Sequence, residues 1–86
     1  MKIYINRFNY VLRRCVQSME LCGNYSEITR VFQHSSQHLE IILKQLEDDS
    51  SLTAADRNQV FFQFLEARQE VRKIMKDYTN FIAWEG

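Results

Sequence analysis

Two histidines and one cysteine are the residues of this chain whose types and spacing come nearest to a chemical site. His34 and His38 are the only histidines, and their i,i+4 spacing places both imidazoles on one face of a helix, as in helical zinc sites. If the segments on either side of Asn24 form a helical hairpin, Cys15 lies at about the height of His34. One thiolate and two imidazoles would then surround a metal ion and leave its fourth position open.

The surroundings of the two histidines favour a simpler interpretation. They belong to the run Gln33-His34-Ser35-Ser36-Gln37-His38, which is typical of the polar flank of a surface helix. A pH-sensitive interface is a further hypothesis, because histidine titrates near physiological pH. We therefore keep His34, His38 and Cys15 only as metal-ligand candidates and expect no bound metal.

The cysteines give catalysis little support. Cys15 and Cys22 both recur on an apolar helical stripe, where a free cysteine acts as a small hydrophobe. Their seven-residue separation is about 10.5 Å along a helix, which is too far for a disulfide. The sequence also has no glycine-rich phosphate loop and no nucleophile elbow. We expect a protein that is not an enzyme, takes no cofactor and keeps reduced thiols in the cytoplasm.

The charges are balanced overall but unevenly distributed. The 11 basic and 11 acidic residues argue against a general polyanion binder, whose affinity depends on phosphate neutralisation. Residues 1–23 carry a net charge of +3 and residues 24–58 a net charge of −3, which neighbouring helices can satisfy mutually. A basic patch of Arg7, Arg13 and Arg14 makes a nucleic-acid-associated regulator the alternative function. A membrane-surface anchor is a third possibility, but no stretch approaches the roughly 20 apolar residues of a span.

Aromatic residues provide the most suggestive binding feature. They crowd the start of the first apolar segment and the end of the last one, and aromatic side chains are enriched at interface hot spots. Packing within the chain would account for either cluster, whereas a partner or a second copy would account for both. The expected partner-binding residues are Tyr4, Phe8, Phe62, Tyr78, Phe81 and Trp84.

Arg68 falls within the apolar stripe of the last segment, in register with Phe64 and Val71. One interpretation is an arginine that lays its aliphatic stem along the edge of the core and keeps its charge in water. The other is a buried polar residue that sets helix register or partner choice, and so determines specificity.

These residues must be positioned by helices, because apolar side chains recur at alternating steps of three and four through most of the chain. The spacing predicts helices over residues 3–22, 25–47 and 54–83, with a polar connector at 48–53. Gly23 is expected to end the first helix in a left-handed conformation. Asn24 with Glu27 resembles a capping box that starts the second helix, and Thr53 is expected to cap the third.

The predicted fold is all-α: one domain over residues 1–86, with three amphipathic helices arranged as an antiparallel helical hairpin and a long third helix. Because the third helix outreaches the first, we expect dimerisation to complete the bundle. The predicted function is a non-enzymatic protein–protein interaction module, namely an adaptor, a regulatory subunit or a small chaperone-like protein. Its partner is a protein, most simply a second copy of the chain, and we expect no membrane partner.

Overall fold

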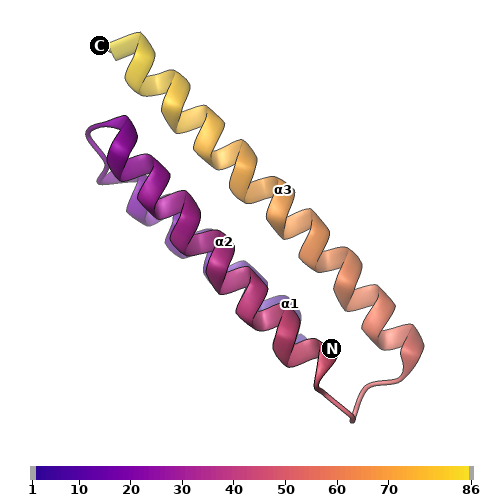
Figure 1. Ribbon diagram of the computed structural model, residues 1–86. Coiled ribbons are helices and arrows are strands. Elements are labelled where there is room, and N and C mark those ends of the chain that lie inside the picture. The colour runs from indigo at the N-terminus through magenta and orange to yellow at the C-terminus, as the bar shows by residue number, and fades with distance from the viewer. Residues whose placement is uncertain (1, 86) are drawn as a thin grey trace.

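The computed structural model describes residues 2–85 and consists there of three helices, which confirms the all-α fold. They are α1 (Lys2–Glu20), α2 (Tyr25–Glu47) and α3 (Ala54–Glu85). Each helix contacts the other two, and the bundle measures 49 × 15 × 14 Å. The chain runs up, down and up, so α1 and α3 are parallel and α2 is antiparallel to both (Figure 1). Met1 and Gly86 lie outside the described residues.

The core is a single apolar cluster to which every helix contributes one stripe. On α1 the buried stripe begins at Tyr4, and the half-buried Ile5 and Leu12 lie at its edge. The one buried polar residue among those described is Ser35, which faces Cys15. The buried apolar residues are Tyr4, Phe8, Val11, Cys15, Met19, Ile28, Leu39, Ile42, Leu46, Val60, Phe64, Ala67, Val71 and Ile74.

The turn between α1 and α2 differs from the prediction at Gly23. No described residue, glycine included, has a positive φ, so Gly23 does not adopt the left-handed conformation. Helix α1 ends two residues earlier than expected, at Glu20, because the amides of Leu21 and Cys22 donate to carbonyls only three residues back, at 3.2 and 3.0 Å. Such bonds tighten the last turn and satisfy carbonyls that a glycine cap would otherwise serve.

The start of α2 has the predicted Asn24 cap, paired with Glu27. The Asn24 side-chain oxygen accepts a hydrogen bond from the Glu27 backbone amide at 2.9 Å. The Asn24 side-chain Nδ2 donates to the Glu27 carboxylate at 2.8 Å, in place of the backbone N–H that donates in a full capping box. This pair satisfies an otherwise free donor of the first turn. At the start of α3, the Thr53 hydroxyl accepts from the Asp56 amide at 3.1 Å.

The connector between α2 and α3 is held by Asp49. One carboxylate oxygen accepts from the Tyr4 hydroxyl at 2.6 Å, and the other accepts from the Ser51 amide at 2.9 Å and from its hydroxyl. The Asp49 carbonyl accepts from the Arg57 guanidinium at 2.7 Å. The hydrogen bonds from Ser51 and Tyr4 lower the pKa of the Asp49 carboxyl to about 2. One residue therefore ties the connector to the beginnings of both α1 and α3.

Helix α3 is the longest element. Its 32 residues span about 48 Å, against about 28 Å for the 19 residues of α1. Its last turns extend past the turn that joins α1 to α2 (Figure 1). The last turns of α3 are therefore not fully covered by α1 and α2.

Candidate protein-binding surfaces

The three metal-ligand candidates do not come together. Among residues 2–85, no group of three His, Cys, Asp or Glu side chains is arranged to hold a metal ion. His34 and His38 line a groove between α1 and α2, whereas Cys15 is 1% exposed in the core beside Ser35. Burial raises the pKa of the Cys15 thiol, an effect that its hydrogen bond with Ser35 opposes. The rotation of α2 that buries Ser35 turns His34 outward.

The expected aromatic surface divides into two parts. Tyr4 and Phe8 are only 4% and 3% exposed, so the structure places both of them in the chain's own core. The Phe8 ring packs against Phe64, with centroids 6.3 Å apart and planes tilted by 52°. These two residues are therefore not part of the candidate surface, because their side chains pack within the chain.

The end of α3 remains exposed. Phe81 is 59% exposed and Trp84 is 86% exposed, and their i,i+3 spacing places them on neighbouring positions of one helix face. Tyr78 is half-buried, and with Asp77 and Phe81 it lines an open hollow of about 340 Å³. Burial and the negative charge of the nearby Glu20 carboxylate raise the pKa of Tyr78. The last turns of α3 thus carry both a projecting apolar side chain and a hollow.

Phe62 also lies on the surface, 64% exposed, but near the other end of α3. About 30 Å of helix separates it from Phe81. It is therefore outside the surface formed by Tyr78, Phe81 and Trp84, which we call the α3 end.

Arg68 lies partly buried beside Phe64, with its guanidinium carbon 5.8 Å from the ring centroid. Its Nε is buried without a hydrogen-bond partner among the described residues. This placement matches a side chain that covers an aromatic face with its stem and plane. Its role in specificity stays a prediction.

The predicted basic patch is split between two faces. Arg7 and Arg14 line the groove between α1 and α2, and Arg13 is exposed outside that groove. Arg7 donates to the Gln45 side-chain oxygen at 2.9 Å and lies 5.5 Å from the Tyr4 ring centroid. The structure adds Arg30 to Arg14 across the groove. The signal for Arg30 was present in the sequence, because Arg30, His34 and His38 share an i,i+4 ladder.

No helix in the described part of the chain is both long enough and apolar enough to cross a membrane. No protein-family model matches the chain, and comparison with curated proteins and with solved structures gives no match either.

Proposed function

We propose that this chain is a small non-enzymatic protein–protein interaction module that self-associates through the α3 end. The observation that carries the proposal is that Phe81 and Trp84 are both exposed within one turn of α3. The long apolar stripe of the same helix is buried in the core. Contiguous exposed aromatic side chains are typical of binding hot spots, and large apolar patches are uncommon on monomers.

A second copy of the chain is the simplest occupant because the α3 end is self-complementary. Trp84 projects from the same two turns that form the hollow beside Tyr78 and Phe81. In a twofold pair of crossing α3 helices, each copy supplies one indole and receives the other. Adaptors, regulatory subunits and small chaperone-like proteins are the roles in which such a subunit would act.

We also propose a cytoplasmic location, and two further features support it and the non-enzymatic role. Cys15 and Cys22 are free thiols, as expected for a reducing compartment. Burial raises the pKa of both thiols, which makes them poor nucleophiles because the thiolate is the reactive form.

The experiment is sedimentation velocity over a micromolar-to-millimolar concentration series. We expect the sedimentation coefficient of the natural chain to rise with concentration and that of Trp84→Ser to stay at the monomer value. Phe62→Ser is the matched control, because it removes another exposed aromatic residue from the same helix at its other end. If the Phe62 and Trp84 variants weaken association equally, the α3 end is not the contact.

The alternative, a nucleic-acid-associated regulator, is favoured by one observation, the meeting of Arg7, Arg14 and Arg30 in a single groove. Binding of this kind would fall steeply as salt is raised.

A further inference from the structure

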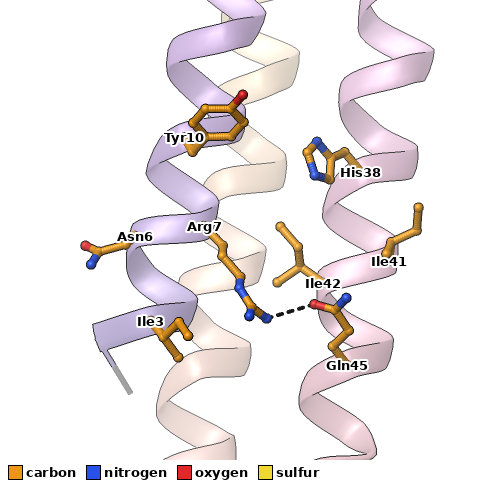
Figure 2. Close-up of a pocket in the computed structure, with 8 residues that line it drawn as sticks. All are labelled: Ile3, Asn6, Arg7, Tyr10, His38, Ile41, Ile42 and Gln45. Atoms are coloured by element: carbon orange, nitrogen blue, oxygen red, sulfur yellow. Dashed lines mark hydrogen bonds between the residues drawn. The ribbon is translucent and has the colours of Figure 1, made fainter.

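The groove between α1 and α2 is a second surface, separate from the α3 end. It consists of two adjoining hollows of about 480 and 410 Å³, which share Tyr10 and His38 as lining residues. Figure 2 shows Tyr10 and Arg7 on the α1 side facing His38 and Gln45 on the α2 side. No residue of α3 lines either hollow, so the groove is a feature of the helical hairpin alone.

The groove concentrates positive charge in a chain whose net charge is zero. Arg14 and Arg30 line one hollow and Arg7 lines the other, and neither lining includes a carboxylate. Arg7 and Arg14 lie two helical turns apart, about 10.5 Å along α1. Arg7 is held by a neutral amide, that of Gln45, so its charge stays available to a ligand.

The same groove also offers apolar contacts. Ile3, Tyr10 and Ile41 are 55%, 51% and 57% exposed along it. The lining also includes the buried Ile42 and the half-buried Val31. A ligand that matches this surface carries carboxylates at helical spacing next to apolar side chains.

A protein helix suits these features better than a nucleic acid. Beyond Ile41, the next hollow on α2 is lined by three carboxylates, those of Glu40, Glu47 and Asp48, and by one cation, Lys44. This excess of negative charge would repel a polyanion that continued past the groove. An acidic helix of limited length avoids those residues. Its glutamates at i and i+7 match the spacing of Arg7 and Arg14.

We propose that the α1–α2 groove binds an acidic amphipathic helix of a partner protein, which packs as a fourth helix on the bundle. Its apolar side chains contact Ile3, Tyr10 and Ile41, and its carboxylates pair with Arg7, Arg14 and Arg30. This is recognition of a helix in a groove, with anchors at i, i+3, i+4 and i+7. The charge pairs at the rim set orientation and association rate, and the apolar contacts supply affinity.

The test uses fluorescence anisotropy with a designed helical peptide that has one apolar face flanked by glutamates at i and i+7. We expect the natural chain to bind this peptide and Arg14→Glu/Arg30→Glu to bind it at least about tenfold more weakly. The matched control, Arg13→Glu/Arg72→Glu, makes the same charge change at exposed positions outside the groove and should keep nearly full affinity.

Four results would overturn the proposal. The first is equal binding of a peptide with lysines in place of the glutamates, and the second is an equal loss of affinity in the two double variants. The third is tighter binding of a single-stranded DNA oligonucleotide of the same charge through Arg14 and Arg30. The fourth is the absence of any binding to the acidic peptide. Trp84→Ser should bind the peptide like the natural chain, so failure of this proposal and failure of self-association through α3 give different results.

Discussion

Replacing Phe64 with alanine tests the rotational setting of α3 about its own axis. This setting is the least obvious feature of the sequence, because Phe61, Phe62 and Phe64 compete for the core within one turn. The structure resolves the competition: Phe64 is 2% exposed and Phe62 is 64% exposed. The two substitutions Phe64→Ala and Phe62→Ala make the same chemical change on the same helix and should therefore differ only through packing.

The expected loss for Phe64→Ala is about 3–5 kcal/mol, from lost apolar transfer and the cavity left behind. It includes the tilted contact with Phe8 at 6.3 Å, a kind of pair worth about 0.5–1.5 kcal/mol. At roughly 0.05–0.15 kcal/mol per residue, a chain of 86 residues has about 4–13 kcal/mol in all. Phe64→Ala should therefore remove a large share of the stability, and it unfolds the protein if the total lies near the lower end of this range. Phe62→Ala should change stability by less than about 0.5 kcal/mol.

Urea denaturation followed by circular dichroism measures both variants. Phe64→Leu gives a third point that should remain folded, with a loss of roughly 1–2 kcal/mol, since leucine keeps much of the apolar volume but not the aromatic pair. The reasoning is refuted if Phe62→Ala costs as much as Phe64→Ala, or if Phe64→Leu has no measurable cost. Either result would mean that α3 presents a different face to the core.

Two further predictions concern the connections between helices. Because the folded-state pKa of Asp49 is lowered to about 2, its contribution to stability is complete above about pH 4 and is lost as the pH falls toward 2. Acid unfolding should show a smaller loss over this window in Asp49→Asn, and an unchanged pH dependence would contradict the assignment. Gly23→Ala should leave the free energy of unfolding unchanged or raise it by up to about 0.4–1 kcal/mol, with a matching change in melting temperature. The reason is that Gly23 has no positive φ and that an added Cβ would lie 3.8 Å from its nearest neighbour, a Glu27 oxygen. A clear loss of stability would show that the turn needs a left-handed residue.

The helices themselves could be predicted from the sequence because their signals are local. Apolar spacing at three and four residues identifies each helix, and the Asn24 cap and the polar connector mark α2 at residues 25–47, as observed. The end of α1 could not be predicted as reliably. Hydrogen bonds from the amides of Leu21 and Cys22 to carbonyls three residues back end the helix, where a left-handed Gly23 was expected to end it.

The surfaces were harder to predict because they depend on how each helix is rotated in the bundle. On α1, a rotation of the helix by one residue position decides whether Tyr4 or Ile5 lies in the core. In the structure Tyr4 is buried and Ile5 lies at the edge of the core. Likewise, Arg14 and Arg30 face one groove only because Cys15 and Ser35 pack together on the inner side. Such rotations are decided by side-chain packing over all three helices, which no single stripe encodes.

The most direct test of the α3 end is the fluorescence of Trp84, the only tryptophan of the chain. In the single chain its side chain is 86% exposed, so its emission at low concentration should be that of a solvated indole. As concentration rises, we predict a blue shift that parallels the increase in mass measured by sedimentation. A mass that doubles while the emission stays solvated would contradict the account, and so would a chain that remains monomeric at millimolar concentration.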